Sequence, residues 1–309
     1  TAYASAGLAG LDSETVTLSD TTLAASVLNT LDGYTTGAVN ASSVNTLTGT
    51  ASVVNTAYSS NGITGLGNEA VTLSGNTSVA NANTTAGNTT GVVTATISEG
   101  DASTLKTLNE TTNAYSITIT DTSVSGADLN TIDGATTATV TAIAVTTITG
   151  TAAAANTAYA SSGISGLGNE AVTLSDTSLA VATLNTLDGN TTGAVNAGTI
   201  TTLTGAAAAM NTAYASNGIT GLANEAITLD DTTLAAATLN TLDGNTTGAI
   251  NATSVSTLTG TFAEVTAAQD SNGITGLEGV ITIITGNMSV AQANSVAAST
   301  TDPVVATIT

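Results

Sequence analysis

The clearest pattern of apolar and polar positions lies in the stretch 231–244, DTTLAAATLNTLDG. Its apolar residues share the i, i+4, i+7 spacing of one helix face: Ala235, Leu239 and Leu242. Asp231 or Thr232 is the expected N-cap, and Gly244 suits the left-handed position that ends a helix. The stretch therefore predicts a short amphipathic helix, and the related stretch 206–218 predicts another.

Short segments rich in Val, Ile, Leu and Thr follow each predicted helix. The stretches 218–229 (GITGLANEAITL) and 248–258 (GAINATSVSTL) are typical of one or two brief strands divided by Gly and Asn. Helices and strands this short are marginal alone and need packing against neighbours. The order of elements is therefore helix, brief strands, helix.

These elements recur throughout the chain. The stretch 233–260 has three further copies, the last of them degenerate, at 178–205, 22–49 and 123–150. Successive glycines of the repeated LDG motif are 55 residues apart, at Gly134, Gly189 and Gly244. Each repeat is internally duplicated into two half-repeats of about 27 residues. A deletion of about eight residues falls near 98–113.

The repeats predict an α/β solenoid of about eleven coils over 1–309, with short strands and one short Ala-rich helix per coil. A pure β-solenoid is the alternative. We expect one continuous domain in which both chain ends fall inside a repeat unit. Thr1 matches the middle of a predicted helix, and 306–309 (ATIT) matches 95–98 (ATIS). Uncapped repeat ends have two explanations: the chain is a portion of a longer repeat protein, or its ends complete each other head to tail. Both predict an extended assembly, and the second predicts end-to-end self-association into a filament.

Composition narrows the possible partners. The net charge is −21, Lys106 is the one basic residue, and His and Cys are absent. With a single cation to neutralise phosphates we expect no nucleic-acid partner, and with no long apolar stretch we expect no membrane insertion. Calcium, bound weakly at several places, would relieve the mutual repulsion of the carboxylates. No other cofactor is expected.

Three acidic rows follow the repeat. The first stands just before the LDG glycines: Asp32, Asp133, Asp188 and Asp243. These carboxylates either accept hydrogen bonds from the turn that follows or hold a weakly bound calcium, and they are the candidate metal ligands. The second row is expected on a solvated face: Glu14, Glu69, Glu170 and Glu225. The third is expected to cap helices: Asp20, Asp121, Asp176 and Asp231.

Recurrent Asn and Thr residues are the remaining candidates. The Asn residues of the LNT and NTAY motifs form either an internal hydrogen-bonded ladder or surface turns: Asn29, Asn55, Asn130, Asn156, Asn185, Asn211 and Asn240. Rows of threonine could bind a regular ligand: Thr17, Thr72, Thr173 and Thr228. Repeated surface carboxylates without a His, Cys or Lys base do not make a catalytic pair in a cleft. We expect no enzyme.

The repeat units have sequences such as TLNTLDGNTTGAVNA and GITGLGNEAVTL. These sequences resemble the repeat regions of very large extracellular proteins of cyanobacteria, which are often labelled haemolysin-type or calcium-binding. The resemblance covers essentially the whole chain and implies an extracellular or cell-surface location and a structural or adhesive role. The calcium-binding G-G-x-G-x-D nonapeptide of such proteins is absent here. The expected function is a filament, surface-layer or adhesin-stalk subunit. The alternative is a binding module for ice, glycan or calcium, with polysaccharide as the candidate partner.

Overall fold

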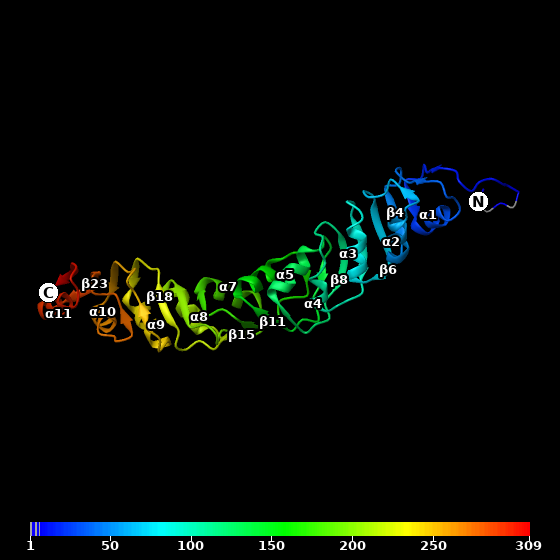
Figure 1. Ribbon diagram of the computed structural model, residues 1–309. Coiled ribbons are helices and arrows are strands. Elements are labelled where there is room, and N and C mark those ends of the chain that lie inside the picture. The colour runs from blue at the N-terminus through cyan, green and yellow to red at the C-terminus, as the bar shows by residue number, and fades with distance from the viewer. Residues whose placement is uncertain (1, 4, 6) are drawn as a thin grey trace. The chain divides into compact units, whose positions relative to one another are not determined.

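The computed structural model describes residues 2–3, 5 and 7–309 (Figure 1). The chain is an α/β protein in which many short parallel strands alternate with helices in repeated units. Two compact units are present, one comprising the residues up to 145 with 160–167, the other 146–159 with 168–309. The expected mid-helix start falls on Thr1, which lies outside the described residues.

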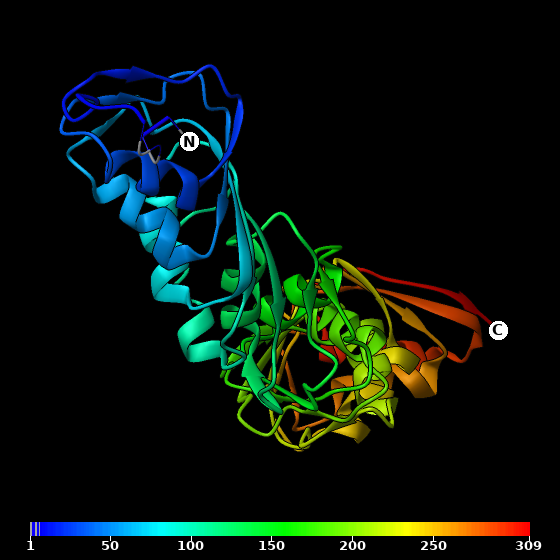
Figure 2. The same cartoon turned by 90° about the vertical axis from the view of Figure 1, so that its right-hand side faces the viewer.

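Within its described residues, the first unit contains a long and a short parallel sheet with helices between the strands. The long sheet has the strand order β12-β10-β8-β7-β6-β4-β2, and the short one is β1-β3-β5. Its strands are β1 (Val16–Thr17), β2 (Thr22–Ala24), β3 (Val39–Asn40), β4 (Thr46–Gly49), β5 (Ile63–Thr64), β6 (Ala70–Thr77), β7 (Val93–Ile97), β8 (Ala114–Thr118), β9 (Ser123–Ser125), β10 (Val140–Thr141) and β12 (Ile164–Ser165). Its helices are α1 (Ala25–Asp32), α2 (Ala51–Ser59), α3 (Val79–Ala86), α4 (Ala102–Leu105) and α5 (Gly126–Gly134). Helices α1, α2 and α3 follow one another side by side (Figure 2).

The second unit repeats the same order of elements. Its strands are β11 (Thr147–Gly150), β13 (Ala171–Leu174), β14 (Ser178–Ala180), β15 (Val195–Asn196), β16 (Thr202–Gly205), β17 (Ile219–Thr220), β18 (Ala226–Leu229), β19 (Thr233–Ala235), β20 (Ile250–Asn251), β21 (Thr257–Gly260), β22 (Ile274–Thr275), β23 (Ile281–Met288) and β24 (Val304–Ile308). Its helices are α6 (Ala152–Ala160, whose last residue belongs to the first unit), α7 (Val181–Asn190), α8 (Ala207–Ala215), α9 (Ala236–Asn245), α10 (Phe262–Gln269) and α11 (Val290–Ser299). The helices exclude the pure β alternative.

Helices and strands of the second unit recur with different spacings. Along the row β14-β16-β18-β20-β22, Leu203 pairs with Ile227 and Ile250 pairs with Ile274. The number of residues between these paired strand positions is smaller than the number between the first residues of successive helices. Those first residues are Val181, Ala207, Ala236 and Phe262. The row therefore shifts away from the helix that follows it. Strand β16 leads almost directly into α8, whereas the whole of β23 separates β22 from α11. In this unit β14 and β19, which lie one repeat apart, each start a new row.

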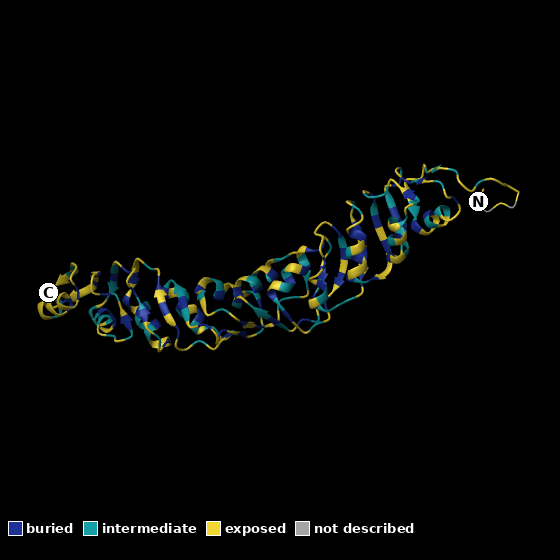
Figure 3. Ribbon diagram, in the orientation of Figure 1, coloured by how far each residue is buried: buried dark blue, intermediate teal, exposed yellow. Residues whose placement is uncertain are grey.

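The core lies between the strand rows and the helices. Buried and exposed residues lie close together throughout the ribbon (Figure 3). In β18 they alternate, so that Ile227 and Leu229 are almost fully buried while Thr228 between them faces solvent. From the helix side, Leu239 and Leu242 of α9 are completely buried. Each such aliphatic side chain contributes about 1.5–3 kcal/mol through burial. Packing against the next half-repeat therefore stabilises helices that are too short to be stable alone.

Both predicted boundaries of the helix at 231–244 are wrong. Residues Thr233–Ala235 form β19, which pairs in parallel with β21, so the helix begins at Ala236. The pairing partner lies in the next half-repeat, which a local pattern does not reveal. Gly244 lies inside α9 and has no left-handed φ. Similarly, α8 ends at Ala215, before Gly218.

Candidate functional site

Three of the four recurrent glutamates are buried, which corrects the expectation of a solvated face. Glu69 is 1% exposed, Glu170 is fully buried and Glu225 is 1% exposed. The carboxylate of Glu69 accepts hydrogen bonds from the backbone N–H of Gly67 at 2.9 Å and of Asn68 at 3.1 Å. It also accepts one from the hydroxyl of Tyr58, which projects from α2. These donors make burial of a carboxylate without a cation tolerable.

The same tyrosine–glutamate pair occurs twice in the second unit. Tyr159 donates to Glu170 at 3.1 Å, and Tyr214 donates to Glu225 at 2.8 Å. Backbone N–H groups two residues earlier complete each site, at Gly168 and Ala223. Within the described residues, Glu170 Oε1 has no hydrogen-bond partner. In each pair the tyrosine precedes the glutamate by 11 residues.

The first repeat has the same residues in a different arrangement. Tyr3 precedes Glu14 by the same spacing, but its ring is stacked with that of Tyr34, with centroids 6.3 Å apart. Glu14 is only half-buried and its carboxylate accepts from the N–H of Ser13. The spacing alone therefore does not determine the pair.

The paired tyrosines hold their protons more tightly than free tyrosine. Burial raises the pKa of Tyr58, and the hydrogen bond and negative charge of Glu69 raise it further. Burial likewise raises the pKa of Tyr159 and Tyr214, to which the nearby glutamates add. The phenol therefore acts as a hydrogen-bond donor to the buried carboxylate, and the pair joins the end of a helix to the residue just before the second strand after it.

Each candidate metal ligand is engaged by a serine of the next half-repeat. The hydroxyl donates to the aspartate Oδ2 at 2.6–2.8 Å in four pairs, which are Ser60–Asp32, Ser161–Asp133, Ser216–Asp188 and Ser271–Asp243. These aspartates therefore bind a neighbouring half-repeat, in place of the predicted bonds to their own turn. Among the described residues no three acidic side chains gather where they could hold a metal ion.

The serine in turn fixes a tight turn. Ser60 Oγ accepts the N–H of Gly62 at 3.0 Å, and the Gly62 carbonyl accepts the N–H of Val39 in the preceding half-repeat at 2.8 Å. A Cβ atom at Gly62 would overlap the Asp32 carboxylate, so only glycine allows this approach. The other three pairs have the same bonds. We call this arrangement the Asp–Ser–Gly turn.

The third acidic row caps helices as expected, but not the helices that follow it. Asp231 accepts the N–H of Ala207, the first residue of α8, at 2.8 Å, and Asp176 does the same for Ala152 of α6. Asp121 binds the N–H of Ala102 at the start of α4. Each cap therefore comes from the neighbouring half-repeat.

The asparagine ladder is confirmed. The side-chain amide of Asn185 in α7 donates to the carbonyl of Ala209 in α8 at 2.9 Å, and Asn211 in α8 donates to Thr238 in α9 at 3.0 Å. The same bond links further neighbouring half-repeats from Asn29, Asn83, Asn156 and Asn240. In α2, Asn55 instead accepts from the hydroxyl of Thr85.

The threonines proposed as a ligand-binding row do not share one row. Thr72 lies between Thr48 and Thr94, and Thr173 between Thr149 and Asn196, in separate sheets. Thr17 and Thr228 belong to two further sheets. Thr94 pairs next with Ala114, and Thr228 pairs next with Asn251, so outward threonines align over only a few strands.

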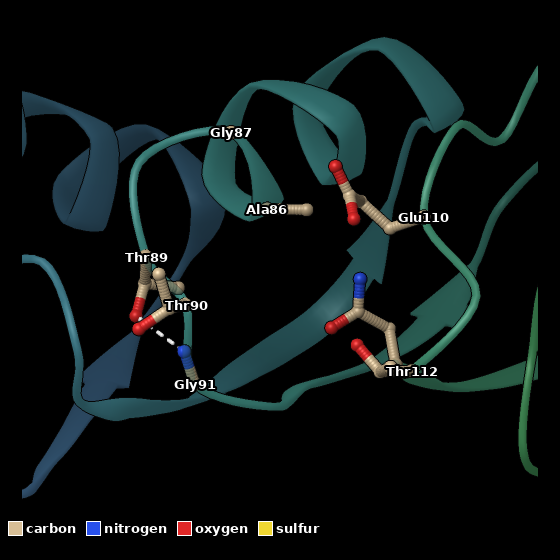
Figure 4. A pocket seen from close by; sticks show the side chains of 8 residues that line it. Ala86, Gly87, Thr89, Thr90, Gly91, Glu110 and Thr112 are labelled. Atoms are coloured by element: carbon tan, nitrogen blue, oxygen red, sulfur yellow. Dashed lines mark hydrogen bonds between the residues drawn. The ribbon is translucent and has the colours of Figure 1, made fainter.

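A polar cavity of about 360 Å³ lies in the first unit, where the half-repeat is shortened (Figure 4). Ala86 ends α3 at the position that Asp32 holds in α1, and α4 has only four residues. Thr89 and Thr90 line one side, and the Glu110 carboxylate lies across from them. Nearby in β8, Tyr115 is fully buried, and burial together with the Glu110 charge raises its pKa to about 12.

Comparison with known protein families, curated proteins and solved structures finds no match. No helix in the described part of the chain has the length and apolar character needed to cross a bilayer. The tyrosines and serines of these clusters were not predicted from the sequence. Their signals are the constant spacings of 11 residues from Tyr to Glu and 28 from Asp to Ser.

Proposed function

We propose that the chain is a structural protein of the extracellular space or the cell surface, a subunit of a filament, surface layer or adhesin stalk, without catalytic activity. Its repeats would form one continuous solenoid, each half-repeat being one coil. Support comes from the way the recurrent polar side chains are used. The recurrent Asp, Asn and Ser residues, and Thr191 after α7, bind the backbone or side chains of a neighbouring half-repeat.

These side-chain contacts would transmit a mechanical load from one half-repeat to the next. The junctions alternate: an Asp–Ser–Gly turn and an asparagine bond join α7 to α8, whereas a helix cap and an asparagine bond join α8 to α9, in each case in addition to the parallel strands. A load along the repeats would therefore be shared among several bonds at each step. The same set of contacts, continued between two copies of the chain, would give end-to-end self-association.

Association can be tested with the purified full chain. Sedimentation velocity over a concentration series, with electron microscopy of the same samples, should show species that lengthen as concentration rises. A single species with the mass of one chain at every concentration would contradict the filament proposal. Small-angle scattering of the dilute chain tests the solenoid itself, because two independently moving units would give a broader distance distribution than one continuous particle.

A binding module for glycan, ice or calcium is the second candidate function. The polar cavity beside Glu110 favours a hydroxyl-rich ligand such as a polysaccharide end, since hydroxyl groups of Thr89, Thr90 and Thr112 line it. The short threonine rows give less support to ice binding. Titration calorimetry with neutral oligosaccharides should detect binding that Glu110→Gln weakens, and equal heats for both chains would count against this site.

A further inference from the structure

Three of the four Asp–Ser–Gly turns contain an Asn–Gly sequence. The pairs are Asn61–Gly62, Asn217–Gly218 and Asn272–Gly273, and they are the Asn–Gly sequences of this chain. The fourth turn has Ser162 before Gly163. All three asparagines are exposed, and each follows the serine that binds the aspartate.

Asn–Gly sequences undergo intramolecular deamidation. The glycine nitrogen loses its proton to water or hydroxide and attacks the side-chain carbonyl carbon of asparagine. A C–N bond forms, ammonia leaves, and water then opens the cyclic imide to aspartate or isoaspartate. Glycine favours this reaction because it has no side chain to hinder the approach.

The Asp–Ser–Gly turn opposes each requirement of that attack. The Gly218 N–H is donated to Ser216 Oγ at 3.0 Å, and the Ser216 hydroxyl is donated to Asp188 Oδ2 at 2.7 Å. The attacking nitrogen therefore has its proton engaged, and the carboxylate beside it disfavours the amide anion. The Gly218 carbonyl is held by the N–H of Val195 at 2.8 Å, which restricts rotation of the backbone.

We propose that Asn61, Asn217 and Asn272 are modification sites whose deamidation is gated by the Asp–Ser–Gly turn. A closed turn keeps the glycine N–H bound to the serine and so slows the attack, and an open turn releases that nitrogen. The product makes opening permanent, because it adds a carboxylate to a chain of net charge −21. Isoaspartate also inserts a backbone methylene into a turn that packs against the aspartate so closely that only glycine fits. Each modified turn thus records a past separation of two half-repeats.

The test compares the three sites within one molecule. The full chain and Ser216→Ala are incubated at neutral pH, and peptide mapping measures the amide-to-acid conversion at each asparagine. Loss of the serine bonds should speed conversion at Asn217 by about tenfold relative to Asn61 and Asn272. Ser216→Thr keeps a hydroxyl and should restore the slow rate.

The denatured chain and the fourth turn serve as controls. In denaturant the three asparagines should react at similar fast rates, and the Ser162–Gly163 peptide should give no conversion in any sample. Folded wild-type chain reacting as fast as denatured chain would overturn the proposal. So would an unchanged ratio between the sites in Ser216→Ala, or an equal rise at all three, which would assign the effect to global unfolding.

Discussion

Two neighbouring regions of the second unit have the same backbone contacts but different buried side chains. At 214–225, Tyr214 donates to the buried carboxylate of Glu225. At the equivalent positions of the next repeat stand Gln269 and Val280. The hydroxyl of Thr246 donates to the Glu225 carbonyl, and that of Thr300 donates to the Val280 carbonyl. The backbone arrangement therefore does not depend on the pair.

Tyrosine and glutamate therefore act as one unit. Val280 is fully buried, and its apolar side chain needs no donor. Gln269 accepts the hydroxyl of Ser299, while its buried Nε2 has no partner among the described residues. Either both polar partners are present or both are replaced, which is the expectation for a buried group that is costly when unpaired.

The largest effect should come from introducing the glutamate without its tyrosine in the region of Gln269 and Val280. Val280→Glu buries a carboxylate without its tyrosine, and we expect a loss of about 3–5 kcal/mol in the free energy of unfolding. Gln269→Tyr combined with Val280→Glu recreates the pair and should recover most of that loss. Urea unfolding followed by circular dichroism measures both, and a single variant as stable as the wild type would contradict the argument.

The reciprocal change in the polar region should cost less. Glu225→Val leaves the Tyr214 hydroxyl and the Ala223 N–H without their acceptor, at a cost of about 2–4 kcal/mol. Tyr214→Gln with Glu225→Val copies the Gln269 and Val280 arrangement. A double-mutant cycle should show favourable coupling between the native partners. Additive effects of the two changes would mean that the residues act independently.

The comparison also shows what the sequence can and cannot specify. The repeat, the alternation of helices with strands and the asparagine ladder follow from local spacing, because Leu239 and Asn240 lie on defined faces of a short helix. The burial of Glu225 does not, because its tyrosine lies on the preceding helix. Likewise Asp231 caps the helix that precedes it in the sequence, and this contact is evident only from the three-dimensional structure.

Alkaline pH should distinguish the two regions without mutation of the core. Burial beside a carboxylate raises the pKa of Tyr214 in the folded chain, so between the unfolded and folded pKa values the unfolded chain loses the proton first. Stability is therefore complete below about pH 10 and falls as pH rises further. In Tyr214→Phe the fall in unfolding free energy with pH should be shallower. Parallel curves for the two chains would show that Tyr214 titrates normally.

The smallest expected effect concerns Thr282 in the region without the pair. Its side chain is fully buried in β23, and its hydroxyl has no hydrogen-bond partner in the part of the chain that the structure describes. The equivalent residue of β18, Ile227, is an aliphatic core residue. Thr282→Val keeps the β-branched form and removes the unsatisfied hydroxyl, so it should stabilise the chain by about 1 kcal/mol.

A matched variant separates this gain from a general preference of strands for valine. Thr228→Val changes an exposed threonine one repeat earlier and should leave the free energy of unfolding within about 0.5 kcal/mol of the wild type. Urea midpoints at constant slope give both values. If Thr282→Val gained nothing while Thr228→Val did, burial of the hydroxyl would not be the cause, and strand propensity would explain the difference between the two regions.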